Sequence, residues 1–99
     1  PMELLLAGAG GCTAFDVVMI LKKARQAITG CKVQLEAVRA ETEPKVFTHI
    51  NMKFIVTGKG LDPVRVEKAV NLSHEKYCSA TIMLGKTAEI THSIEIIEG

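Results

Sequence analysis

The sequence of 99 residues has 12 lysine and arginine side chains against 11 aspartate and glutamate side chains, so its formal net charge is +1. A charge so close to zero gives no argument for binding to nucleic acid or to an anionic membrane. No uninterrupted apolar run reaches the ~20 residues of a membrane-spanning helix. We also find no basic, then apolar, then small-residue segment typical of a secretory signal.

The length allows one domain, residues 1–99, and a chain this short would gain from oligomerisation because it buries a modest fraction of its surface. Three cysteines without an export signal indicate reduced thiols in a cytoplasmic protein rather than a disulfide framework. No cysteines or histidines have the spacing of a zinc site, so we expect no metal.

A long helical pattern opens the chain, from Glu3 to about Ala27. Its apolar residues follow the helical period. Lys22, Lys23 and Arg25 stand near its end, where cations suit the helix dipole. Thr29-Gly30 is the expected C-terminal stop.

Three glycines, Gly8, Gly10 and Gly11, stand in this helix just before Cys12. Glycine inside a helix costs about 1 kcal/mol relative to alanine, so each needs a reason. Another backbone could approach closely, or the glycines could merely permit tight packing with no chemistry nearby. Alternatively, the segment could be a strand entering a dinucleotide-binding turn, but Thr13 replaces that turn's third glycine and no second βαβ unit follows.

Two strands are predicted next, because apolar and polar residues alternate over 32–37 and again over 49–56. A turn at 41–45 joins them into an antiparallel hairpin. Asp62-Pro63 has the residues of a helix start, an acidic N-cap followed by proline. The predicted buried face of that helix consists of Val66, Ala69, Val70, Ser73 and Tyr77.

A short segment with Ile82, Met83 and Leu84 ends at Gly85, and alternation over 87–96 predicts the last strand. The element order predicts an α+β fold, with two helices packed on an antiparallel sheet. His92 falls on the apolar face of the last strand, as expected of a core histidine with a hydrogen-bond partner. His49 and His74 fall on polar faces and are expected to be solvated.

The cysteines stand in three different contexts: Cys12 in the first helix, Cys31 at the start of a strand and Cys78 where the second helix ends. A single buried cysteine usually behaves as a small apolar residue. This structural role is the expectation for Cys31. Asp16 stands four residues after Cys12 on the same helix face, where its charge would raise the pKa of the Cys12 thiol.

Two segments resemble the two cysteine motifs of the OsmC/Ohr family. They are Pro1-Met2-Glu3-Leu4-Leu5-Leu6-Ala7-Gly8-Ala9-Gly10-Gly11-Cys12 and His74-Glu75-Lys76-Tyr77-Cys78-Ser79. This family comprises the osmotically inducible protein C and organic hydroperoxide resistance proteins. Segments 47–58 and 90–93 are similar to its strands, and Gly-Gly-Cys and Asp-Val-Val are words of its YhfA-related subgroup. The resemblance covers this whole chain, which corresponds to the later part of a typical member, after the usual N-terminal strands.

The resemblance implies a thiol-dependent peroxidase that needs no cofactor. Cys12 would attack an organic hydroperoxide, Cys78 would form a disulfide with it, and a dihydrolipoyl-type dithiol would reduce that disulfide. The family places a glutamate directly after the motif proline, where this chain has Met2. Glu3, one residue later, is the candidate for that role, although a helix points it elsewhere.

The resemblance also implies an intertwined homodimer whose helices are wrapped by sheets, and an arginine near the thiols that comes from the earlier strands. The alternative function is a dimeric module without enzymatic activity that binds a small apolar ligand between its helices. Consumption of an organic hydroperoxide with dithiol turnover distinguishes the two.

Overall fold

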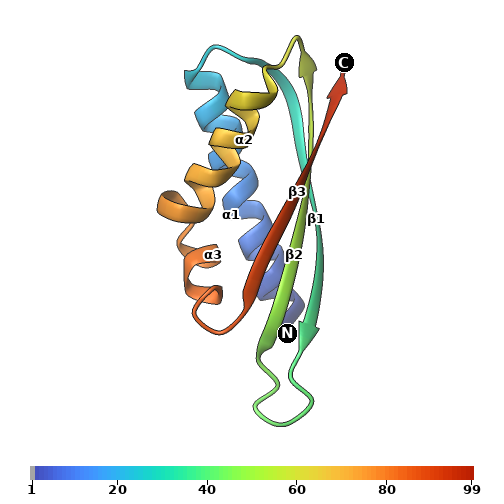
Figure 1. Cartoon of the computed structure of the whole chain (residues 1–99), viewed down its shortest axis with the longest axis vertical. Coiled ribbons are helices and arrows are strands. Elements are labelled where there is room, and N and C mark those ends of the chain that lie inside the picture. The colour runs from blue at the N-terminus through green and yellow to red at the C-terminus, as the bar shows by residue number, and fades with distance from the viewer. Residues whose placement is uncertain (1) are drawn as a thin grey trace.

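The computed structural model describes residues 2–99, in which helices and one sheet form two layers (Figure 1). In chain order the elements are α1 (Met2–Lys23), β1 (Ala27–Arg39), β2 (Phe47–Lys59), α2 (Pro63–Leu72), the π-helical turn η1 (Ser73–Tyr77), α3 (Ser79–Leu84) and β3 (Glu89–Glu98). All the helices cover one face of the sheet. The predicted α+β class is confirmed.

The sheet has the strand order β1-β2-β3 and is mixed, not antiparallel as predicted. β1 and β2 form the expected antiparallel hairpin, in which Leu35 lies opposite Met52. β3 instead runs parallel to β2, with His92 opposite Met52. The chain from α2 to α3 forms the long crossover that a parallel pair requires, and alternation within a strand carries no information about this direction.

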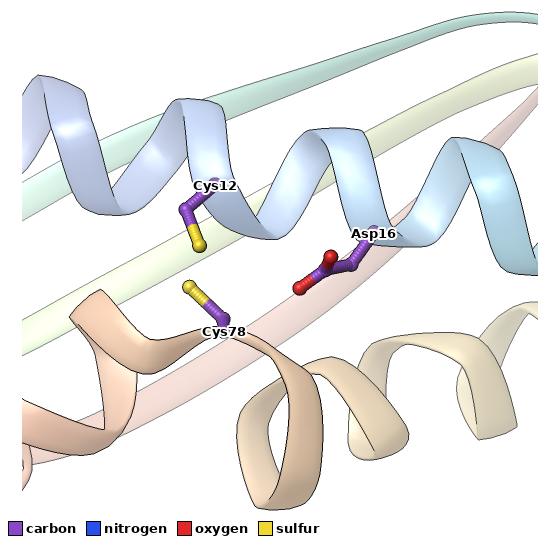
Figure 2. Close-up of side chains that lie close together, drawn as sticks. All are labelled: Cys12, Asp16 and Cys78. Carbon is purple, nitrogen blue, oxygen red and sulfur yellow. The ribbon is translucent and has the colours of Figure 1, made fainter.

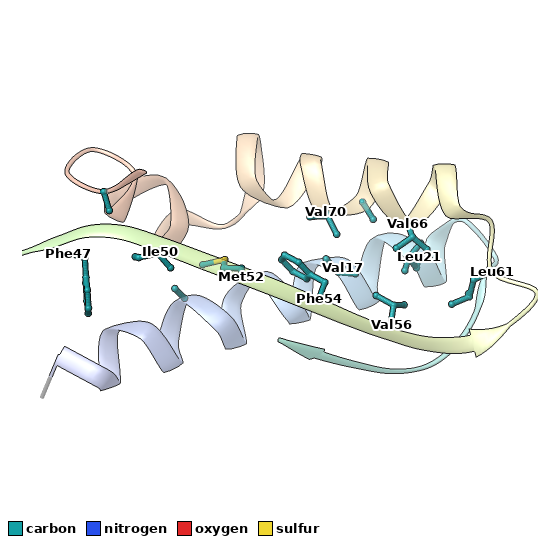
Figure 3. Packing of buried hydrophobic residues seen from close by; sticks show 13 residues of the cluster. Val17, Leu21, Phe47, Ile50, Met52, Phe54, Val56, Leu61, Val66 and Val70 are labelled. Atoms are coloured by element: carbon teal, nitrogen blue, oxygen red, sulfur yellow. The ribbon is translucent and has the colours of Figure 1, made fainter. Parts of the chain in front are cut away.

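The core lies between α1, α2 and the inner face of β2 (Figure 3). The predicted alternation of β2 is confirmed, because Ile50, Met52, Phe54 and Val56 are fully buried. Fully burying one such side chain stabilises a fold by roughly 1.5–3 kcal/mol. From the helices, the completely buried apolar residues are Ala9, Val17, Leu21, Val66, Ala69 and Val70.

Helix α1 ends at Lys23, four residues before the predicted end. Arg25 adopts a left-handed backbone conformation with φ of 60°. The Arg25 N–H donates to Lys22 O and the Gln26 N–H to Leu21 O, at 3.0 and 2.9 Å. These two bonds form a Schellman cap. Thr29-Gly30, the predicted stop, lies inside β1 instead. The true end of the helix could not be predicted, because the cap has an arginine at the position where glycine is usual.

The predicted start of the second helix is confirmed, since Asp62 caps α2 and accepts a hydrogen bond from the Val64 N–H at 3.0 Å. Ser73, on the predicted buried face, is buried, but Tyr77 is exposed. The reason is the π-helical turn, in which the Cys78 N–H donates to Ser73 O at 2.8 Å, five residues back. The wider turn breaks the helical period between Ser73 and Tyr77.

The glycines of α1 have different surroundings. A Cβ at Gly10 would lie 2.7 Å from Leu35 Cδ1, so a side chain of β1, rather than a backbone, approaches it closely. A Cβ at Gly8 or Gly11 would meet no atom of the described chain within 4 Å. Because the whole segment is helical, the dinucleotide-binding alternative is wrong.

Helix α1 has 22 residues, and an 18-residue window of it has a mean hydropathy of 2.0, which would also suit a membrane-spanning helix. The sequence prediction concerned uninterrupted apolar runs, and α1 is interrupted by a few polar residues. By its length and mean hydropathy, however, α1 does qualify as a candidate membrane span, which corrects the prediction. Core helices of soluble proteins meet the same criteria. Since α1 packs against β1, α2 and α3, its composition is weak evidence for a membrane location.

Candidate functional site

Cys12 and Cys78, 66 positions apart in the sequence, face each other across the contact between α1 and the start of α3 (Figure 2). Asp16 lies beside them on α1. The two Sγ atoms and a carboxylate oxygen of Asp16 all lie within 4.8 Å of one another. We call Cys12, Asp16 and Cys78 the thiol–carboxylate cluster. Both cysteines are free thiols, and Cys78 is buried whereas Cys12 is partly exposed.

The Cys78 sulfur occupies a polar environment although its residue is fully buried. It caps α3, and Thr81 donates to it twice, from the backbone N–H at 3.4 Å and from Oγ1 at 3.0 Å. The sulfur also lies 3.8 Å from Ala9 O, to which the thiol form can donate. These contacts fix the position of the Cys78 sulfur at the start of α3.

A short chain of hydrogen bonds holds the Asp16 carboxylate. The Ser73 hydroxyl donates to Asp16 Oδ2 at 3.1 Å and lies 2.7 Å from Thr13 Oγ1. A hydroxyl has one proton to donate, so Thr13 is the donor to Ser73. Thr13 and Ser73 are both fully buried. The carboxylate therefore has a fixed position next to the thiols.

The surroundings of Cys12 favour its neutral form. Burial raises the pKa of the Cys12 thiol, and its hydrogen bond to Cys78 and the charges of Cys78 and Asp16 act in the same direction. A hydrogen bond from the backbone of Ala80 lowers the pKa in part. The predicted effect of Asp16 thus has the expected sign, but burial is the larger cause.

Glu3 and Cys31, by contrast, do not join the cluster. Glu3 lies nine residues before Cys12 on α1, which places it about 13 Å away along the axis and on the opposite side of the helix. It borders a small cavity beside Arg39 and Phe47. Cys31 is half-buried on β1 opposite Val56, and burial raises the pKa of its thiol.

A cavity of about 520 Å³ opens beside the cluster. Asp16 lies on its wall, so the cavity borders the thiol–carboxylate cluster. Its other lining residues are mostly apolar: Phe15, Met19, Ile20, Lys23, Leu72 and Tyr77.

Two of the three histidines, His74 and His92, depart from the prediction. His74 is not solvated: it stacks on His92 with ring centroids 5.0 Å apart and contacts Phe54 edge-on. Burial, followed by the charge of His92, lowers the pKa of His74 to about 4. His92 does face Phe54 but is exposed at the sheet edge rather than buried in the core. His49 is partly exposed beside Thr91.

The residues that orient the cluster are Thr13, Ser73 and Thr81, and the sequence predicts none of them as a site residue. Buried hydroxyls carry no motif of their own. The one signal is the position of Ser73 on the apolar face of its predicted helix, where a polar residue needs a hydrogen-bond partner.

Comparison with known proteins gives consistent matches. The sequence matches the family described as OsmC-like protein over residues 1–93. Protein YhfA of Escherichia coli strain K12 is 54% identical over 97 residues, which cover 98% of this chain and 72% of YhfA. A hypothetical protein from Aquifex aeolicus VF5 superimposes with a TM-score of 0.95 at 37% identity, over 100% of this chain and 74% of that chain.

The same fold occurs in an organic hydroperoxide resistance protein OsmC from Legionella pneumophila, described as a predicted redox protein and regulator of sulfide bond formation. It has a TM-score of 0.71 at 18% identity, over 96% of this chain and 68% of that one.

Proposed function

Because the chain belongs to the OsmC-like protein family, as its motifs predicted, we propose that it is a thiol-dependent peroxidase that reduces organic hydroperoxides in the cytoplasm. The observation that carries the proposal is the pair of free thiols, Cys12 and Cys78, whose sulfurs face each other within 4.8 Å. Two cysteines with purely structural roles have no reason to meet with their sulfurs beside a carboxylate.

The reaction uses the two thiols in sequence. The Cys12 thiolate attacks the peroxide oxygen, the O–O bond breaks, and the alkoxide leaves as the alcohol after protonation. Cys12 is then a sulfenic acid, and the Cys78 thiol condenses with it to a disulfide with loss of water. A dihydrolipoyl-type dithiol reduces this disulfide by two exchange steps and becomes a disulfide itself.

The assignment of Cys12 as the attacking thiol rests on access. Cys12 is partly exposed, whereas Cys78 is completely buried, so a substrate reaches Cys12 first. The two donors of Thr81 hold the Cys78 sulfur in place opposite Cys12. Glu3 is too far along α1 to take part from within the same chain.

The adjoining cavity supports an organic rather than an inorganic peroxide. Its volume is about 520 Å³ and its walls are largely apolar, which suits the alkyl or aryl part of a hydroperoxide. Asp16 joins the cavity to the thiols, so a substrate lying in the cavity would place its peroxide group near Cys12.

The test is consumption of cumene hydroperoxide with dihydrolipoamide as reductant and a chelator present. The wild-type chain and Cys31→Ser should turn over at the same rate, and Cys12→Ser should be inactive. Cys78→Ser should react once and stop as a sulfenic acid or a higher oxide. Peptide mapping should find the Cys12–Cys78 disulfide; oxidation of Cys31 with Cys12 intact would overturn the proposal.

The second candidate is a non-enzymatic module that binds a small apolar ligand, again as a dimer. The apolar cavity and the raised pKa of Cys12 favour it, since a neutral thiol is a poor nucleophile. Saturable binding of an apolar fluorescent probe, displaced by an alcohol but without hydroperoxide consumption, would decide for this function.

The exposed side of α1 supports assembly into a homodimer. Leu4 and Phe15 are 76% and 66% exposed, and Met19 lies on the same stretch. Gly8 and Gly11 leave room among them, because a Cβ there would meet no described atom within 4 Å. A second copy of α1 packed on this side would use the glycines for close approach and, because Phe15 and Met19 also line the cavity, would complete part of the cavity wall.

A further inference from the structure

The thiol–carboxylate cluster has the composition of a metal site as well as that of a redox pair. Its three donor atoms come from two elements that are distant in the sequence and lie within 4.8 Å of one another (Figure 2). We propose that the cluster binds Zn²⁺, with Cys12, Asp16 and Cys78 as its protein ligands and a water molecule in the fourth position. The ligands include both thiols of the proposed peroxidase, so bound Zn²⁺ would exclude turnover and protect the thiols from oxidation, whereas binding of the metal does not itself require peroxidase activity.

The geometry fits a tetrahedral ion. Zn–S bonds of about 2.3 Å place two tetrahedral sulfur ligands about 3.8 Å apart, and Zn–O bonds are about 2.1 Å. The donor atoms already lie within 4.8 Å of one another, so small rotations of side chains bring them to these distances. Cys12 and Asp16 are four residues apart on α1, a spacing that places two ligands on one helix face, as in helical zinc motifs.

The charges of the cluster favour a cation. Ionised thiols and a carboxylate repel one another, and none of the ion pairs found among residues 2–99 includes Asp16. Its hydrogen-bond donor is Ser73, which is neutral. A divalent cation reverses the situation, because it deprotonates its thiol ligands and is stabilised by the same carboxylate that opposes a free thiolate.

The hydrogen bonds around the cluster resemble those that orient metal ligands. The Ser73 hydroxyl holds Asp16 Oδ2 at 3.1 Å, and Thr81 donates to the Cys78 sulfur from its hydroxyl at 3.0 Å. Such outer contacts fix ligands in position and support metal affinity. The cavity along Asp16 gives an entry path for the ion.

The experiment is titration of the full chain, reduced with a phosphine that binds metals weakly, with Co²⁺ as a spectroscopic probe and then with Zn²⁺. One equivalent of Co²⁺ per chain should give the intense visible bands of a tetrahedral ion and the near-ultraviolet charge-transfer band of thiolate ligands. Zn²⁺ should remove both. No saturable binding, or a spectrum of octahedral Co²⁺ without thiolate bands, would overturn the proposal.

Variants identify the ligands. We expect Cys12→Ser and Cys78→Ser to weaken the charge-transfer band, and Asp16→Asn to lower Zn²⁺ affinity by roughly tenfold or more. Cys31→Ser and Glu67→Gln, on β1 and the exposed side of α2, are the matched controls and should bind as the wild type does. Because Cys78 is buried, circular dichroism is used to check that Cys78→Ser is folded. If it is not, the Cys12→Ser variant still tests the proposal, because Cys12 is partly exposed.

Equal affinity of Asp16→Asn and the wild type would overturn the three-ligand site. The peroxidase assay contains a chelator, so a loss of hydroperoxide turnover and a loss of metal binding are separate results.

Discussion

At the residue scale, the main feature is that α1 presents both a thiol and, one turn later, the carboxylate that opposes ionisation of that thiol. Cys12 and Asp16 lie on one face, and Ser73 fixes the carboxylate there. An enzyme that needed only a reactive Cys12 thiolate would gain from a neutral residue at position 16. The carboxylate therefore either lowers the reactivity of the Cys12 thiol without compensation or has a separate use, such as binding the proposed metal ion.

Asp16→Asn tests the electrostatic effect. Removing a charge that raises the pKa of Cys12 should increase alkylation of Cys12 by iodoacetamide near neutral pH, roughly two- to fivefold for a partly solvated pair. The increase is modest because the charge of Asp16 is the smallest of the causes that raise the pKa of Cys12. The rate is measured by mass spectrometry in the presence of a chelator, with Glu67→Gln as control. An unchanged or slower rate would show that Asp16 does not act on the thiol.

His74 predicts a pH dependence of stability. Its pKa is lowered to about 4 in the folded chain, against about 6.5 for an exposed histidine. The unfolded chain therefore binds more protons between these values, and the contribution of His74 to stability is lost as the pH falls from about 6.5 to 4. Urea unfolding across this range should show a smaller loss for His74→Phe than for the wild type or His49→Gln. Equal slopes would contradict the prediction.

At the element scale, α1 serves two sides of the molecule. Its buried stripe, which includes Val17 and Leu21, packs in the core, while Gly8, Gly11 and Phe15 lie on the exposed side. The π-helical turn η1 is equally important, because it changes the helical phase directly before Cys78 and directs that side chain toward α1. π-helical turns often occur at functional sites.

Gly11→Val tests the exposed side of α1. A Cβ at position 11 would meet no described atom within 4 Å outside its own stretch of helix, so we expect little change in packing within one chain. If a second α1 approaches this glycine, overpacking should weaken the dimer by about 1–3 kcal/mol. Dissociation is followed by sedimentation, with Glu67→Val on α2 as the control for valine in an exposed helix. A dimer as stable as the wild type would place the interface elsewhere.

At the scale of the whole molecule, one sheet face is covered by helices and the outer side of α1 bears exposed apolar residues. We expect a homodimer that buries more than roughly 1,000 Å² in total, the lower bound of a specific interface. Light scattering at micromolar concentration should give twice the mass of the chain, 10.7 kDa. A monomer under these conditions would contradict the dimer and leave the apolar side of α1 without an explanation.

The sequence by itself determined the local features of this protein. The helical period predicts α1, the alternation of β2 identifies the four residues that are fully buried, and Asp62-Pro63 predicts the start of α2. These signals are reliable because each depends on neighbouring residues and on which side of an element is buried. The words around Cys12 and Cys78 also predicted the family correctly.

Only the tertiary structure decided the direction of β3, the end of α1 at Arg25 and the hydroxyls of Thr13, Ser73 and Thr81 that orient the thiol–carboxylate cluster. Each depends on residues distant in the sequence or on a backbone conformation without a residue signature. Local periodicity specifies which side chains are buried, but the path of the connections specifies which of them meet. Zinc spacing was therefore absent from the linear sequence, although the fold brings two thiols and a carboxylate within 4.8 Å.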